Sequence, residues 1–163
     1  MTIIDREHKA AFGTLLGVGP GNVEVYSSDY STADRERMPN RQAFSHFVDG
    51  VYMGHKWQCV ELARRYLYLN HGYVFDDAAI AYDIFRLRDV RRVKDGGRLP
   101  LKSFRNGAKR QPEPGCMLIW SEGGEFVRTG HVAIVTEVFP DRVRCLVQNV
   151  EDKPWPAGHT YSR

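Results

Sequence analysis

Apolar positions recur with helical spacing in one stretch near the middle of the chain. Between about residues 58 and 70 they form two neighbouring faces. One face consists of Val60, Ala63 and Leu67, and the other of Leu62, Tyr66 and Leu69. Gly72 follows at a position where helices often end in a left-handed residue. Because the apolar surface is wide, the pattern predicts a largely buried helix.

A second helix is predicted from Asp77, a residue suited to cap a helix N-terminus. Ile80, Ile84 and Leu87 follow it at helical spacing. Before the first helix, the segment 27–41 is polar and rich in turn-forming residues, and we interpret it as a long surface loop.

Strand patterns dominate the last third of the chain. Residues 116–120, 130–138 and 143–150 are apolar runs, and the last two are joined by a short turn around Pro140 and Asp141. Residues 23–26 alternate like a further short strand. A helical part followed by antiparallel strands is typical of an α+β fold.

Length and composition fit one globular domain. The chain has 163 residues, of which 42% are hydrophobic and 26% charged, which excludes a disordered or fibrous chain and favours a single domain over residues 1–163. The net charge of +3 is too small to imply a nucleic-acid partner. Segment 86–110 concentrates ten basic and two acidic residues, but it offers only Phe104 near its centre for stacking, so a solvated loop surface is favoured.

The N-terminal part gives no sign of export or membrane insertion. Residues 1–7 lack the basic and then apolar pattern of a secretion signal. The least polar stretch, 11–23, is interrupted by glycines and a proline and does not resemble a membrane span. We therefore expect a cytoplasmic protein without a membrane partner.

Three cysteines narrow the chemistry. Cys59, Cys116 and Cys145 are far apart and form no Cys-x-x-Cys pair, so neither a disulfide framework nor a thiolate zinc site is expected. Cys116 and Cys145 lie in apolar runs, as small buried side chains do. Cys59 follows a polar segment and begins the predicted helix, whose dipole and free N–H groups favour the anion. The sequence therefore predicts a lowered pKa and a nucleophilic thiolate at Cys59.

A cysteine nucleophile needs a base, and the chain offers six histidines. Those in polar or turn-like contexts, which we interpret as surface residues, are His8, His46, His55, His71 and His159. His131 begins an apolar strand, an unfavourable place for an imidazole without a function or a partner. A Cys59–His131 pair is one hypothesis, and a hydrogen-bonded structural histidine is the other. Gln58 offers an amide donor for an oxyanion, or is simply a polar residue of the first turn.

Two segments match a known family. Residues 57–65 read Trp-Gln-Cys-Val-Glu-Leu-Ala-Arg-Arg, and residues 130–134 read Gly-His-Val-Ala-Ile. The chain resembles the CHAP family of cysteine, histidine-dependent amidohydrolases and peptidases, and within it the amidase domains of glutathionylspermidine synthetase/amidases and their trypanothione-synthetase relatives. Further likeness lies in residues 13–17, 26–31, 52–56, 123–126 and 148–150. The resemblance thus covers nearly the whole chain in one register.

The resemblance implies a papain-like CHAP fold of class α+β, with helices packed on a small antiparallel β-sheet. It also implies hydrolysis of the amide that joins the glycine carboxyl of glutathione to a polyamine, which releases glutathione and spermidine from glutathionylspermidine. Cys59 is then the nucleophile, His131 the base, and a glutathionyl thioester the intermediate. No metal and no organic cofactor is required.

The sequence departs from the family pattern in two places. In bifunctional relatives an ATP-using synthetase domain follows the amidase domain, whereas this sequence ends at Arg163, before the amidase domain of the relatives usually closes. We therefore expect no ligase activity, loss of a fused synthetase domain, and either a fragment or a shortened form. The family also has an acid that orients the histidine immediately before the Gln-Asn pair, and here Val147 occupies that position.

Other residues are candidates to replace the missing acid. Alternate residues of a strand share a face, so Asn149 or Glu151 could orient His131 in place of Val147. The sequence does not choose between them, because the register of the hairpin is not fixed by its turn.

Substrate charges suggest three further candidates. Arg64, about one turn after Cys59, is expected to pair with a glutathione carboxylate, or is a structural surface arginine. Asp29 and Asp34 in the polar segment are candidates to face the polyamine.

Three alternative functions stay open at this point. The first is another CHAP activity, an amidase or endopeptidase acting on peptidoglycan, which the lack of a secretion signal disfavours. The second is a weak or inactive CHAP-like module that binds thiol–polyamine conjugates, which Val147 keeps open. The third and weakest is nucleic-acid binding through residues 86–110.

Overall fold

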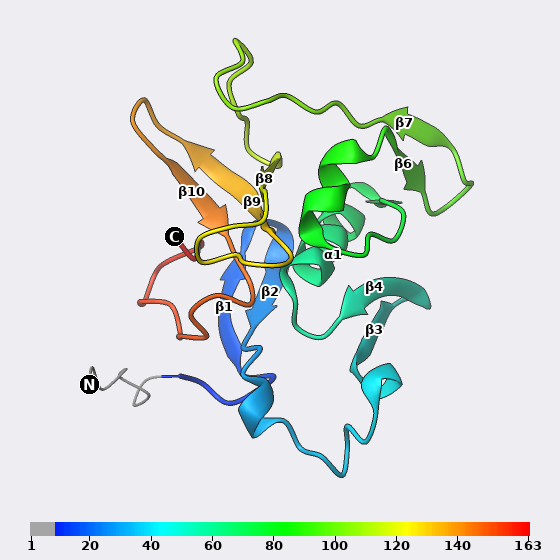
Figure 1. The fold of residues 1–163 in the computed structure, drawn as a ribbon, viewed down its shortest axis with the longest axis vertical. Helices are drawn as coiled ribbons and strands as arrows, with labels where there is room; N and C mark the ends of the chain where they lie inside the picture. Colours follow the sequence, from blue (N-terminus) through cyan, green and yellow to red (C-terminus); the bar gives the residue numbers. More distant parts are fainter. Residues whose placement is uncertain (1–8) are drawn as a thin grey trace.

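The computed structural model describes residues 9–163, so the expectations about residues 1–7 and His8 lie outside the described part. Helix α1 lies at the centre of the fold (Figure 1). It runs from Cys59 to His71, and Gly72 ends it in the left-handed conformation with a φ of 74°. This confirms the helix predicted from apolar spacing, with each end displaced by one residue.

A three-stranded antiparallel sheet packs against this helix. Its strands are β8 (Met117–Trp120), β9 (His131–Val138) and β10 (Val143–Leu146), in the order β10-β9-β8. Leu62 and Ala63 of α1 share the core with Val132 and Ile134 of β9, and all four are 1% exposed. The predicted sheet is therefore confirmed, and it sets the start of α1 beside the start of β9.

The third strand is shorter than predicted. It ends at Leu146 rather than at residue 150. Asn149 adopts a φ of 65°, which turns the chain and ends the alternation of side chains between two faces. The expectation that residues 147, 149 and 151 share one face of a strand is therefore wrong.

Two hairpins were not fully predicted, because glycines interrupt their apolar pattern. Strand β1 (Leu15–Gly19) pairs with β2 (Val23–Tyr26), the one strand of the four that the sequence indicated. Strand β3 (Ser45–Val48) pairs with β4 (Val51–His55). Gly54 of β4 is needed because a Cβ atom there would lie 3.1 Å from the Glu61 backbone, so its absence lets α1 approach the strand.

Part of the basic segment belongs to a small sheet. Strands β5 (Tyr73–Val74), β6 (Asp89–Arg92) and β7 (Arg98–Pro100) pair in that order and are antiparallel. Several of its arginines meet acidic neighbours: Arg98 lies 2.6 Å from Asp89, and Arg92 lies 2.9 Å from Asp95. The segment is solvated, as expected. Its interpretation as a loop is only partly confirmed, because β6 and β7 lie within it while residues 101–110 belong to no helix or strand.

The second predicted helix is also wrong in type and extent. Residues 81–86 form a short 3-10 turn, η5 (Ala81–Arg86), and Ile80 before it is extended. The Asp77 carboxylate accepts hydrogen bonds from Ala78 N and from Arg64, so it holds a turn instead of capping a helix. Ile84, 1% exposed, still enters the core as its spacing indicated.

The segment 27–41 is only partly a surface loop. Ser27 and Ser28 are buried within it, and three short 3-10 turns occur before α1, namely η2 (Pro20–Asn22), η3 (Tyr30–Thr32) and η4 (Arg41–Phe44). One central helix with small antiparallel sheets confirms the α+β class. Among residues 9–163, no helix has the length and apolar character needed to cross a bilayer.

Candidate active site

Cys59 is the first residue of α1, directly after the exposed N-cap residue Gln58. Its thiol is buried, with 9% of the residue exposed. Burial raises the pKa of the Cys59 thiol, and the backbone N–H groups of Val132, Val60 and Cys59 itself, which face the sulfur, only partly oppose it. The expectation of a lowered pKa is therefore wrong: at neutral pH the group is a thiol surrounded by donors.

His131 is the first residue of β9 and is 3% exposed. Its ring stacks on that of Phe126, with centroids 4.5 Å apart and planes 9° from parallel. The ring of Trp120 is tilted against the imidazole, with centroids 5.6 Å apart. Burial and the nearby Arg163 lower the pKa of His131 to about 4, while Glu125 acts in the opposite direction. The imidazole is therefore neutral at pH 7 and able to accept a proton.

The two predicted catalytic residues lie on adjoining elements. The backbone N–H of Val132, which follows His131 in β9, faces the Cys59 sulfur. Within residues 9–163, no hydrogen bond joins the two side chains, and the buried His131 Nε2 atom has no partner. The arrangement therefore holds a neutral thiol and a neutral imidazole, a combination that can act when proton transfer accompanies attack on a carbonyl.

Within residues 9–163, neither residue predicted to orient His131 forms a hydrogen bond with its ring. Asn149 accepts a hydrogen bond from Ser28 Oγ at 2.7 Å, and Glu151 lies 3.3 Å from Arg163 in an exposed ion pair. Their assignment as orienting groups therefore has no support in the contacts described.

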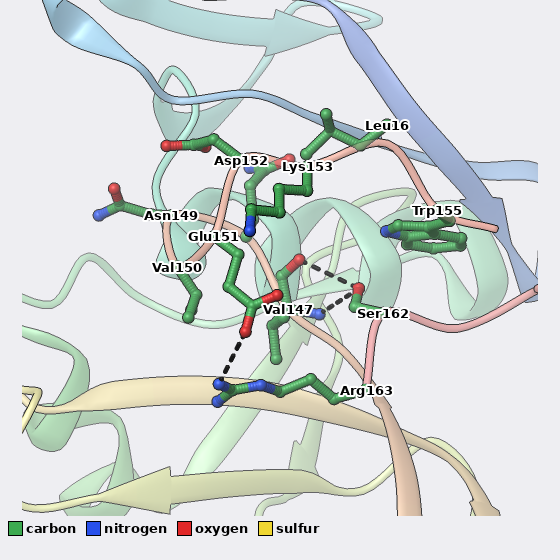
Figure 2. Close-up of a pocket in the computed structure, with 11 residues that line it drawn as sticks. Leu16, Val147, Asn149, Val150, Glu151, Asp152, Lys153, Trp155, Ser162 and Arg163 are labelled. Carbon is green, nitrogen blue, oxygen red and sulfur yellow. Dashed lines mark hydrogen bonds and ion pairs between the residues drawn. The ribbon is translucent and has the colours of Figure 1, made fainter. Parts of the chain in front are cut away.

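Val147 lines a pocket between the segment after β10 and the end of the chain (Figure 2). Its backbone N–H donates to Ser162 Oγ at 2.9 Å, and its carbonyl accepts from the same hydroxyl at 3.2 Å. Arg163 shares this pocket and pairs with Glu125 and Glu151. The charged groups that act on the pKa of His131 are Arg163, which lowers it, and Glu125, which raises it, and the sequence indicated a role for neither.

Arg64 is not a surface arginine. It is 2% exposed, and its guanidinium donates to three backbone carbonyls, those of Met53, Phe75 and Asp76. These bonds tie α1 to β4 and to the segment after β5. Its role as a ligand for a substrate carboxylate stays a prediction, and the contacts described give it a structural role.

The acidic candidates for the polyamine hold local turns. Asp29 accepts hydrogen bonds from Ser31 N and Ser31 Oγ, and Asp34 accepts them from Glu36 N and Arg37 N. Both patterns are typical of short polar side chains in turns. Their assignment to substrate stays a prediction.

A buried charge network behind Cys59 was not predicted. Glu61 is fully buried and accepts hydrogen bonds from Arg65 at 2.6 Å, from His46 Nδ1 at 2.8 Å and from Gln148 at 2.9 Å. Together with its partners Arg65, His46 and Gln148 it forms the Glu61 network. These contacts hold the pKa of the Glu61 carboxyl below its usual range although burial opposes them, so it is an anion. The interpretation of His46 as a surface residue is wrong.

A sequence signal for this network existed in part. Glu61 and Arg65 are four residues apart on one helix, the spacing of an intrahelical ion pair. His46 and Gln148 are joined to them only by the fold. Among the described residues, no cluster of three His, Cys, Asp or Glu side chains is arranged to hold a metal ion.

Comparison with known proteins identifies the family of this chain. A family model described as the CHAP domain matches residues 50–149, a range that includes Cys59, His131 and Val147. The bifunctional glutathionylspermidine synthetase/amidase of Escherichia coli (strain K12) is 51% identical to this chain over 94% of its length. A trypanothione synthetase of Crithidia fasciculata is 33% identical over 94%, and a glutathionylspermidine synthase of the same organism is 37% identical over 93%.

The similarity concerns one part of each relative. The chain spans 25% of the length of the Escherichia coli protein and 22–23% of the two from Crithidia fasciculata. The family match covers well over half of the chain, and the mixed helix and antiparallel sheet are consistent with it. The chain therefore belongs to the CHAP domain family.

Proposed function

We propose that this protein is a cysteine-dependent amidohydrolase that cleaves the amide between glutathione and a polyamine, with glutathionylspermidine as the substrate. The similarity to a synthetase/amidase supports the amidase reaction, because CHAP is the domain that the chain shares with that relative. One observation carries the proposal: the Cys59 sulfur lies at the start of α1 and faces the backbone N–H of the residue that follows His131.

The proposed first step forms a thioester. His131 takes the proton of the Cys59 thiol as the sulfur attacks the glycyl carbonyl carbon. The carbon–nitrogen bond then breaks, and the proton passes from the imidazolium to the departing polyamine nitrogen. Because both groups start neutral, no stable thiolate is needed before the substrate binds.

Water completes the proposed cycle. His131 removes a proton from a water molecule, whose oxygen attacks the thioester carbonyl. The carbon–sulfur bond then breaks to release glutathione, and the imidazolium returns its proton to the sulfur, which restores the thiol and the neutral imidazole. In both steps negative charge develops on the carbonyl oxygen. The N–H of Cys59, at the start of the helix, and the exposed amide of Gln58 are the proposed donors to it.

Glutathionylspermidine hydrolysis by the chain as it stands tests the proposal. We expect release of spermidine, and we expect Cys59→Ala to lose at least about 10³-fold in rate because the nucleophile is gone. Cys116→Ala is the matched control and should retain the wild-type rate. Hydroxylamine added during turnover should yield glutathionyl hydroxamate if a thioester forms. Wild-type protein without hydrolysis, or Cys59→Ala with full activity, would refute the proposal.

A peptidoglycan peptide in the same assay distinguishes the proposed amidase from a CHAP enzyme that acts on peptidoglycan. Cleavage of that peptide in preference to glutathionylspermidine would replace the proposed substrate. The same assay also tests whether residues 1–163 act as a single amidase domain without a synthetase part.

A second candidate is a binding module with little or no turnover. The specific observation in its favour is that His131 has no acidic hydrogen-bond partner among residues 9–163, with Val147 at the position of the family acid. Tight binding of glutathionylspermidine by calorimetry, with no hydrolysis by either wild type or Cys59→Ala, would establish this function instead.

A further inference from the structure

Gln148 joins the segment after β10 to the start of the helix that carries Cys59. It is 1% exposed, and its side-chain amide makes three hydrogen bonds. Nε2 donates to the backbone carbonyl of Gln58 at 3.0 Å and to Glu61 at 2.9 Å, and Oε1 accepts from Tyr26 N at 3.0 Å. The side chain therefore touches β2, the helix N-cap and the Glu61 network at once.

The partners of the Gln148 amide show which of its atoms is the nitrogen and which is the oxygen. Glu61 is anionic and the Gln58 carbonyl is an acceptor, so both require the NH₂ group, whereas Tyr26 N–H requires the oxygen. A carboxylate at position 148 would face two acceptors, and an apolar side chain would leave buried groups without partners. Only an amide of this length satisfies all three groups.

The bond to the Gln58 carbonyl acts on the peptide that leads into the nucleophile. The Gln58 C=O and the Cys59 N–H belong to one planar peptide unit, so a bond that fixes the carbonyl also fixes the direction of the N–H. Leu62 N also donates to this carbonyl, at 3.2 Å. Two donors at its oxygen polarise the peptide and make its N–H a stronger donor at the other end.

We propose that Gln148 is a positioning residue, which holds the Gln58–Cys59 peptide so that its N–H meets the oxyanion formed when Cys59 attacks a carbonyl. This inference rests on the proposed function. Gln148 acts through the peptide and does not itself touch the reacting atoms. The Glu61 network gives it a rigid anchor, because Glu61 is fixed in turn by Arg65 and His46.

Gln148→Met tests the inference, since methionine has a similar length and no hydrogen-bonding amide. We expect kcat for glutathionylspermidine to fall about tenfold or more, with KM within threefold, because the lost interaction matters in the transition state. Alkylation of Cys59 by iodoacetamide creates no oxyanion, so its rate should stay within twofold of wild type. Gln111→Met, at an exposed position, is the matched control and should change neither rate.

Each other outcome overturns the inference in a recognisable way. A kcat of Gln148→Met within twofold of wild type, with wild type active, removes this inference alone. Equal losses in hydrolysis and alkylation show a purely structural role. Wild type without hydrolysis removes the proposed function and this inference with it. If Gln148→Met does not fold, Gln148→Asn, whose amide is too short to reach Gln58 and Glu61 together, is measured by the same two rates and judged by the same criteria.

Discussion

Glu61, on the helix that begins with Cys59, receives hydrogen bonds from three side chains, whereas His131 on the facing strand has a buried Nε2 atom without a partner among residues 9–163. The Cys59 side of the site is thus held by charge-assisted hydrogen bonds. The His131 side is held by stacking on Phe126 and by the sheet.

This difference separates stability from chemistry. Removing one partner of a buried ion pair with complete hydrogen bonding is costly, because the remaining partner keeps its charge and is shielded from water. A buried imidazole without a partner is costly to protonate, which keeps it neutral. We therefore expect loss of the Glu61 charge to act mainly on folding, and changes at His131 to act mainly on pH dependence and rate.

The largest effect is expected when the Glu61 network loses its anion. Glu61→Gln leaves Arg65 charged and buried without a carboxylate, so the free energy of unfolding should fall by about 3 kcal/mol. Urea denaturation measures it. Glu137→Gln breaks an exposed ion pair with Arg144 and should cost less than about 1 kcal/mol. Equal losses for the two variants would show that the network does not dominate stability.

The next effect is a pH dependence that originates at His131. Its pKa is lowered from 6.5 to about 4, so between these values the unfolded chain binds a proton that the folded protein does not. The contribution of the neutral His131 to the free energy of unfolding is fully present above pH 6.5. It is lost as the pH falls toward 4, which lowers the free energy of unfolding by about 3 kcal/mol in all. Urea titrations at pH 7 and 4.5 should show a smaller decrease for His131→Phe than for wild type. Parallel decreases would exclude His131 as the source.

An acid placed on the His131 side of the site should raise the rate of hydrolysis. Val147→Glu places a carboxylate in the pocket that Arg163 also lines, and Arg163 is the charged group that lowers the His131 pKa. We expect at least a tenfold gain in kcat, because an anion stabilises the imidazolium that forms during attack. Val147→Gln has the same shape without the charge and should give little gain. A gain of equal size from both variants would mean that size, and not charge, is responsible.

The smallest effect is expected at Glu151. Its carboxylate meets Arg163 in an exposed pair and does not contact His131. Glu151→Gln should therefore change kcat by less than about twofold and stability by less than about 1 kcal/mol. A loss of tenfold or more in the hydrolysis assay would identify Glu151 as the orienting group after all.

The elements that carry the candidate residues followed from local patterns. Helical spacing and Gly72 gave α1 within one residue, and the apolar run after Gly130 gave β9. Strands β1 and β4 were missed because their glycines serve contacts with distant segments, as Gly54 does with Glu61. The helix expected from Asp77 failed for a similar reason, since Arg64 from another element takes part in the turn there.

The sequence by itself determined that Cys59 stands at a helix start and His131 at a strand start. Periodicity and capping depend on residues within one or two turns, so they can be read from neighbours. Only the tertiary structure decided that burial raises the Cys59 pKa, that Arg64 is a buried structural residue, and that Gln148 reaches the Gln58 carbonyl. Desolvation and hydrogen-bond partners depend on segments far apart in sequence, 90 residues for Gln148 and Gln58 and 122 for Gln148 and Tyr26, and the fold alone brings these together.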